Sequence, residues 1–214
     1  MAVVIINPNS TASMTEAMLA QAREAAPGLA FEAWTSTEAP PAIQGAEDGA
    51  VATPPLLELV QRAADQGADG IMIGCFDDTA LSEAAALASC PVIGIGQAAY
   101  HYAVMRHWRF SVVTTLAVSV PVIEQNIAAY GLGAFASRVR ASEIPVLDLE
   151  SDPAGSAKSV LEEARTAAAE DDIHAVILGC AGMLSVAQDV QASLRIPVVD
   201  PVWCAARWFN WHQA

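Results

Sequence analysis

One short pattern occurs twice in this sequence, about half a chain apart. An apolar run at residues 70–73 ends in Gly74-Cys75, and a second run at residues 175–178 ends in Gly179-Cys180. The cysteines are 105 residues apart, and each is followed 16 or 17 residues later by a proline and another apolar run. Because a repeat on this scale marks a duplicated unit, we expect two similar halves with buried strands at matching places.

Apolar segments of strand length alternate with longer helical patterns along the chain. We expect strands near residues 3–6, 29–34, 70–74, 91–95, 109–114, 138–141, 175–178 and 197–199. We expect helices over residues 11–26, 55–66, 79–88, 97–107, 118–130, 154–170, 182–194 and 201–211, with two prolines at the start of the second. This alternation predicts an α/β fold with parallel sheets and helices on their faces. We assign residues 1–96 and 200–214 to an N-terminal lobe and residues 97–199 to a C-terminal lobe.

Charge and composition limit the partners. A net charge of −14 with a single lysine disfavours binding to nucleic acid or to an anionic membrane surface. Apolar residues make up 54% of the chain, enough for a core, but no apolar run reaches the ~20 residues of a membrane-spanning helix. The first seven residues indicate a strand rather than a signal peptide, so we expect a cytoplasmic protein with a small-molecule substrate.

The four cysteines differ in their expected positions. No CxxC pair occurs, which favours free thiols over disulfides or a zinc site. Ligands of parallel sheets bind beyond the carboxyl ends of the strands, where Cys75 and Cys180 are expected. A helix beginning after each would lower the thiol pKa from ~8.5 toward neutrality. Cys90 precedes a strand and is interpreted as structural, and Cys204 as a core or interface residue.

If a pseudo-twofold axis relates the halves, the cleft between them has one of these two thiols on each wall. Two equivalent bases on opposite sides of a planar intermediate are what inversion of a carbon stereocentre requires. One thiolate would remove a proton, the other thiol would deliver one to the opposite face, and backbone N–H groups after each cysteine would stabilise the enolate. The pattern therefore predicts a racemase that needs no cofactor.

Other motifs in the chain carry weaker signals. Residues 94–96 lack the third glycine of a dinucleotide fingerprint, because position 99 is alanine. Asp77-Asp78 is interpreted as a turn or helix cap rather than a metal pair. The four histidines show neither triad nor metal spacing. We therefore expect no metal and no nucleotide cofactor.

Several segments together resemble the hydantoin racemase family of the aspartate/glutamate racemase superfamily, from residue 5 to about residue 200. They are Ile6-Asn7-Pro8-Asn9-Ser10-Thr11, Cys75-Phe76-Asp77-Asp78, Pro91-Val92-Ile93-Gly94-Ile95, Phe110-Ser111-Val112-Val113-Thr114-Thr115 and Leu178-Gly179-Cys180-Ala181-Gly182-Met183. The resemblance implies two pseudosymmetric flavodoxin-like lobes with the active site in the cleft between them. It also implies that Cys75 and Cys180 are the acid/base pair.

The resemblance further implies the residues that bind the substrate. They are Asn9, Thr114 and Thr115 at its polar groups, Ile43 in the loop at residues 41–45, and the backbone of Phe76, Asp77, Ala181 and Gly182 at its carbonyls. Racemases of free amino acids in the superfamily typically have Asn-Thr after the first cysteine and Thr-His or Thr-Glu after the second. The different residues here favour a 5-substituted hydantoin or allantoin over aspartate or glutamate.

Alternatives remain open at this stage. The same fold could carry an aspartate or glutamate racemase, an arylmalonate-type decarboxylase or a cis–trans isomerase in which a cysteine attacks covalently. A small-molecule sensor without catalysis is a further alternative. The aromatic C-terminal segment, residues 203–212, favours packing or a subunit interface, and a homo-oligomer is expected.

Overall fold

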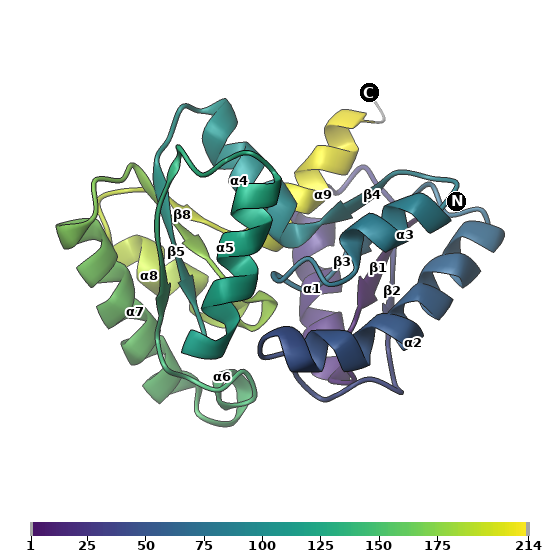
Figure 1. Cartoon of the computed structure of the whole chain (residues 1–214), viewed down its shortest axis with the longest axis horizontal. Helices are drawn as coiled ribbons and strands as arrows, with labels where there is room; N and C mark the ends of the chain where they lie inside the picture. Colours follow the sequence, from purple (N-terminus) through teal and green to yellow (C-terminus); the bar gives the residue numbers. More distant parts are fainter. Residues whose placement is uncertain (1, 213–214) are drawn as a thin grey trace.

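In the computed structural model, which describes residues 2–212, two four-stranded parallel sheets lie side by side, each covered by helices (Figure 1). The strands are β1 Val3–Asn7, β2 Phe31–Thr35, β3 Gly70–Ile73, β4 Val92–Gly94, β5 Phe110–Thr114, β6 Ala136–Ala141, β7 Ala175–Leu178 and β8 Val198–Val199. The α-helices are α1 Ala12–Ala25, α2 Ala46–Asp65, α3 Leu81–Leu87, α4 Ile95–Met105, α5 Val120–Ala129, α6 Asp148–Ser151, α7 Pro153–Glu170, α8 Ala187–Ser193 and α9 Pro201–His212. Two 3₁₀ helices are η1 Ala117–Ser119 and η2 Ala181–Val186. The α/β class and the two lobes predicted from the sequence are confirmed.

The two sheets have the same topology. Their strand orders are β2-β1-β3-β4 and β6-β5-β7-β8, so the second sheet repeats the first. Ile6 at the end of β1 lies opposite Ile73 of β3, and Val113 of β5 lies opposite Leu178 of β7. The central strands are buried along their whole length because helices cover both faces, which explains their continuous apolar runs. Each half therefore brings one Gly-Cys pair to the carboxyl edge of its sheet.

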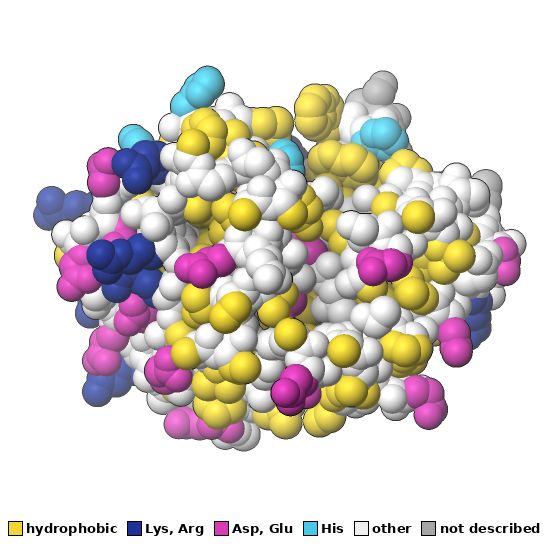
Figure 2. Space-filling model, in the orientation of Figure 1, with side chains coloured by type: hydrophobic (Ala, Val, Ile, Leu, Met, Phe, Trp, Pro, Cys, Tyr) yellow, Lys and Arg dark blue, Asp and Glu magenta, His cyan; other side chains and the backbone are white. Residues whose placement is uncertain are grey.

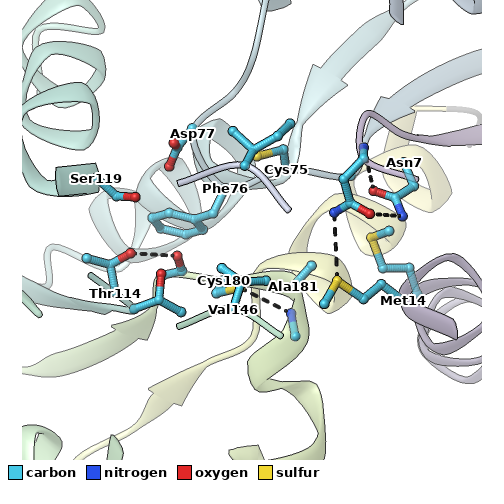
Figure 3. A pocket seen from close by; sticks show the side chains of 17 residues that line it. Asn7, Met14, Cys75, Phe76, Asp77, Thr114, Ser119, Val146, Cys180 and Ala181 are labelled. Carbon is cyan, nitrogen blue, oxygen red and sulfur yellow. Dashed lines mark hydrogen bonds between the residues drawn. The ribbon is translucent and has the colours of Figure 1, made fainter. Parts of the chain in front are cut away.

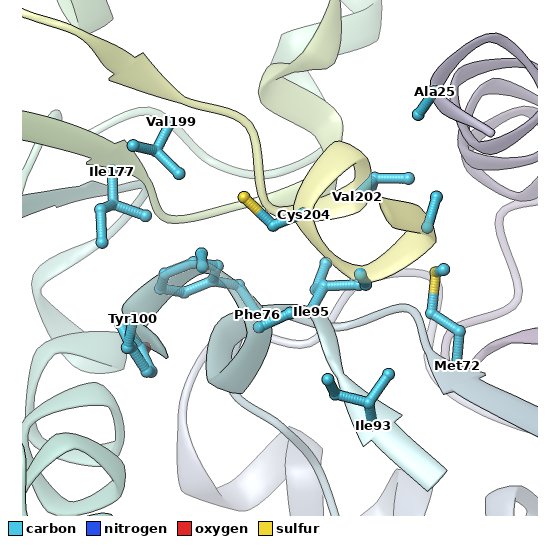
Figure 4. Close-up of a cluster of buried hydrophobic side chains, with 14 of the residues drawn as sticks. Ala25, Met72, Phe76, Ile93, Ile95, Tyr100, Ile177, Val199, Val202 and Cys204 are labelled. Carbon is cyan, nitrogen blue, oxygen red and sulfur yellow. The ribbon is translucent and has the colours of Figure 1, made fainter. Parts of the chain in front are cut away.

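Helix α9 packs against α1 and α4 between the sheets (Figure 1). One apolar core cluster contains Met72 of the first sheet, Ile177 of the second and Val202 of α9. Figure 4 shows Val202 and Cys204 between side chains from the two sheets, which fits the interpretation of Cys204 as a core residue. The lobes therefore share a core rather than meeting at a polar interface.

Some element boundaries differ from the sequence-based prediction. Helix α2 begins at Ala46 rather than near residue 55, so Pro54 and Pro55 lie inside it. The earlier start follows Gly45, whose φ of 90° is readily adopted only by glycine and turns the chain into the helix. The helix predicted to begin at residue 182 starts as the 3₁₀ helix η2 and becomes α-helical only at Ala187.

Charge is unevenly distributed on the face shown in Figure 2. Asp and Glu side chains are spread over both lobes, whereas most of the visible Lys and Arg side chains lie over the C-terminal lobe. In that lobe Arg140 pairs with Glu163, Glu170 and Asp171 at 2.7–3.0 Å. Within residues 2–212, no helix is both long and apolar enough to cross a membrane.

We predict that Phe209→Ala lowers the free energy of unfolding by about 3–5 kcal/mol, the usual cost of a large cavity in a core. Phe209 of α9 is completely buried, and its ring occupies the space that a Cβ on Gly70 would need. Urea denaturation measures the change. Asn210→Ala on the same helix is the control, because Asn210 is exposed, and it should cost under about 0.5 kcal/mol. Equal losses in both variants would contradict this account of α9.

Candidate active site

A cavity lies between the lobes and is lined by residues of both. All ten residues predicted from the sequence line it: Asn9, Ile43, Cys75, Phe76, Asp77, Thr114, Thr115, Cys180, Ala181 and Gly182. Seven further residues complete the lining: Asn7, Met14, Met18, Gly74, Ser119, Val146 and Gly179. The fold thus brings together residues that are more than 170 positions apart in the sequence.

Cys75 and Cys180 lie on opposite walls of this cavity (Figure 3). Each follows a glycine beyond the carboxyl end of a central strand, and both residues are half-buried. Packing requires glycine at Gly179, where a Cβ would meet the Thr114 backbone, whereas a Cβ at Gly74 would meet the flexible end of the Met18 side chain. All four cysteines, which fall within the described residues, are free.

The expected lowering of the thiol pKa values was wrong. Burial raises the pKa of Cys180 to about 11 and that of Cys75 well above its usual value. Backbone N–H groups oppose this only in part: Gly182 donates to Cys180 Sγ at 3.4 Å, and Asp77 N–H favours the Cys75 thiolate. No helix begins directly after Cys75, because a turn intervenes and α3 starts at Leu81. After Cys180 the helix is the short 3₁₀ segment η2, which offers little dipole.

Asp77 adds a third ionisable group to the cavity. Its side chain is buried, and burial raises the pKa of its carboxyl to about 7, although the backbone N–H of Gly45 favours the charged form. Its charge in turn raises the pKa values of both Cys75 and Cys180. The ionisation of the two thiols is therefore linked to the charge on this carboxylate.

The turn after Cys75 is held by the opposite lobe. Asn126 of α5 donates from Nδ2 to the carbonyl of Asp77 at 2.7 Å, and Tyr130, directly after α5, donates to Asp78 Oδ2 at 2.9 Å. Asp78 also accepts a hydrogen bond from the backbone N–H of Gly96 at 3.0 Å. This role of Asp78 agrees with the interpretation of the acidic pair as a turn. Within the described residues, no group of His, Cys, Asp and Glu side chains is arranged to hold a metal ion.

A network of side chains fixes the polar end of the cavity. Asn7 donates to Asn9 Oδ1 at 2.9 Å, and the backbone N–H of Thr11 donates to the same oxygen at 2.9 Å. The Asn9 amide nitrogen has only a weak contact with Met14 Sδ at 3.7 Å, so it can donate to a ligand. Across the cavity, Thr114 Oγ1 donates to the carbonyl of Gly179 at 3.1 Å. Asn9 is thus presented as a rigid donor.

Two loops, one before α2 and one before α6, meet beside the cavity. Gln44 Oε1 accepts a hydrogen bond from the backbone N–H of Val146 at 2.9 Å, and Ser13 donates to Glu150 at 2.8 Å. Met14 and Val146 pack beside Cys180 in one apolar cluster. Sequence reasoning missed Asn7, Met14, Met18, Ser119 and Val146 as lining residues, and it noted Gly74 and Gly179 only as the residues before the cysteines. Only Asn7 carried a signal, since it lies in the same Asn-Pro-Asn motif as Asn9.

Comparison with known proteins agrees with this geometry. The family model described as Asp/Glu/Hydantoin racemase matches residues 3–208. A hydantoin racemase from Rhizobium meliloti is 42% identical over 208 residues, which cover 95% of this chain and 85% of that protein.

Two solved structures resemble the whole chain. An allantoin racemase from Klebsiella pneumoniae is 37% identical with a TM-score of 0.90, covering 98% of this chain and 86% of that one. An allantoin racemase from Pseudomonas fluorescens is 31% identical with a TM-score of 0.92, covering 98% and 89%. Both the sequence match and the shared fold extend over both lobes and the cavity between them. The chain therefore belongs to the Asp/Glu/hydantoin racemase family and is an isomerase of the racemase class.

Proposed function

We propose that this protein inverts the stereocentre of a 5-substituted hydantoin or of allantoin by proton transfer between Cys75 and Cys180, without a cofactor. The observation that carries the proposal is that the two thiols, one from each lobe, line a single cavity from opposite walls. The similarity to hydantoin and allantoin racemases supports a cyclic ureide as the substrate class.

In the proposed reaction one cysteine acts as a thiolate and the other as a thiol. The thiolate removes the proton from the stereogenic carbon, and the electron pair of the broken C–H bond passes into the adjacent carbonyl as an enolate. The opposite thiol then protonates the same carbon from the other face, which inverts it. The two cysteines exchange roles for the other enantiomer, so the reaction runs in both directions.

The enolate oxygen needs hydrogen-bond donors in a site that excludes water. The backbone N–H groups of Phe76, Asp77, Ala181 and Gly182 lie directly after the two cysteines and are proposed for this role. Asn9, Thr114 and Thr115 would bind the remaining polar groups of the ring, and Ile43 would contact its substituent. The acidity of a C–H group next to a ring carbonyl allows thiols to act as the bases.

Three further parts of the proposal concern the protein as a whole. We propose lobe boundaries at residues 1–96 with 200–214 and at residues 97–199, of which residues 1, 213 and 214 lie outside the described part. A cytoplasmic location is proposed, supported by the four free thiols. A homo-oligomer is proposed, supported by the exposed side chain of Trp211 on the aromatic helix α9.

We predict that Cys75→Ala and Cys180→Ala each lower the rate of racemisation by at least about 10³-fold, because each removes one of two required proton-transfer groups. Polarimetry with hydantoins and allantoin measures inversion, and NMR in deuterated water should show deuterium entering the stereocentre. Cys90→Ala is the matched control and should retain wild-type activity. Wild-type rates in both variants would exclude the two-thiol mechanism, and loss of CO₂ from the substrate in ordinary water would indicate a decarboxylase instead.

We predict that Asp77→Asn lowers the pKa values of both active-site thiols. An ionised Asp77 disfavours a nearby thiolate, so removing its charge makes each thiolate easier to form. The difference should appear above about pH 7, where the Asp77 carboxyl of the wild type is ionised. The pH dependence of cysteine alkylation, read for each thiol by mass spectrometry, measures it.

The control for this experiment is Asp189→Asn, which removes an exposed carboxylate on α8 and should leave both thiol profiles unchanged. Identical alkylation profiles for the wild type and Asp77→Asn would show that Asp77 does not influence the thiols.

A further inference from the structure

The carboxyl group of Asp77 is a polar group of the cavity whose hydrogen bonding is incomplete. The residue is only 8% exposed, and its Oδ2 atom has no hydrogen-bond partner among the described residues and no contact with solvent. Buried acceptors are normally paired, because an unpaired one has lost its water without a replacement. Asp77 lines the same cavity as both thiols, so a bound molecule can supply the missing donor.

The carboxyl of the neighbouring Asp78 shows that an unpaired oxygen is not a general property of this turn. Asp78 accepts hydrogen bonds from Tyr130 and Gly96, and the backbone N–H of Gln97 also stabilises its charged form. The contact of Asp77 with the opposite lobe, by contrast, is made by its main chain: its carbonyl accepts from Asn126. Loss of the Asp77 side chain therefore leaves this contact in place.

We propose that Asp77 Oδ2 accepts a hydrogen bond from a ring or ureido N–H of the substrate, so that the enzyme selects ureides with a free N–H at this point. This inference rests on the function proposed above and adds a side-chain contact that decides specificity. A site built to pair a substrate N–H rejects an analogue without it, because the buried acceptor then stays unpaired.

The groups around Asp77 are consistent with a carboxylate that accepts a hydrogen bond from the substrate. The backbone N–H of Gly45 already favours the carboxylate form. The other titratable groups that interact with it are Cys75, Cys180, Asp78 and Tyr100, which supply no positive charge. A substrate N–H therefore gives the Asp77 carboxylate a hydrogen-bond donor. The same N–H weakens the repulsion between this carboxylate and a nearby thiolate.

An asparagine at this position provides a sharp test. The backbone N–H of Gly45 favours the charged form of the Asp77 carboxyl, and in Asp77→Asn the amide oxygen would keep this interaction. The amide NH₂ would then occupy the place of Oδ2 and face the substrate N–H with a second donor. Asp77→Asn should consequently bind an N–H substrate no better than Asp77→Ala does, although the two variants differ in size.

The experiment measures kcat/KM for racemisation of a 5-substituted hydantoin and of its N1-methyl and N3-methyl derivatives. In the wild type, methylation of one ring nitrogen should lower kcat/KM by about 10- to 100-fold, the usual effect of losing a hydrogen bond to a charged group. In Asp77→Ala, the same methylation should change kcat/KM by less than about threefold, because the contact is already absent. Asp189→Asn should show the wild-type sensitivity to methylation.

Three results would overturn the inference while leaving the racemase function intact. They are wild-type tolerance of methylation at both nitrogens, equal sensitivity to methylation in Asp77→Ala, and an Asp77→Asn variant that binds the unmethylated hydantoin as tightly as the wild type does. If the Asp77 variants do not fold, as judged by circular dichroism, the methylation series on the wild type decides alone. A wild-type protein that racemises none of the unmethylated hydantoins or allantoin would overturn the proposed function and this inference together.

Discussion

The apolar core formed by α1, α4 and α9 between the two sheets holds both carboxyl edges against one cavity. Side chains of both sheets, such as Met72 and Ile177, belong to the same buried cluster, so neither sheet can shift far without disturbing the other. The duplicated topology then places Gly74-Cys75 and Gly179-Cys180 at equivalent positions on facing walls. Chemistry that needs two groups on opposite faces of one carbon depends on this shared core.

Burial of the cavity has opposite effects on binding and on ionisation. It excludes water, which strengthens hydrogen bonds to a ligand, but it also raises the pKa values of Cys75 and Cys180. Asp77 adds to this effect whenever it is ionised, so the ionisation of the three groups is coupled. The turn that carries Asp77 is fixed by Asn126 from the other lobe, which makes the electrostatics of the site a property of both lobes together.

The site was predictable where the sequence repeats or matches a motif. Cys75 and Cys180 were found from the duplicated pattern, and Asn9, Thr114 and Thr115 from the resemblance to a family. Met14, Ser119 and Val146 were missed, because they come from a helix and loops whose sequences carry no pattern of their own. The direction of the thiol pKa shifts was also predicted wrongly, since a helix start close in sequence says nothing about how deeply a sulfur is buried.

The sequence by itself determined the alternation of strands and helices, the duplication and the two cysteines at strand ends, because hydrophobic period and motif spacing are local properties of the chain. The tertiary structure alone decided which loops meet beside the cavity, as in the contact between Gln44 and Val146. It also decided that the carboxyl of Asp77 is buried with an unpaired oxygen while that of Asp78 is satisfied. Whether a carboxyl group is buried, and which hydrogen-bond partners it meets, depends on segments that are far apart in the chain. Only tertiary packing brings those segments together.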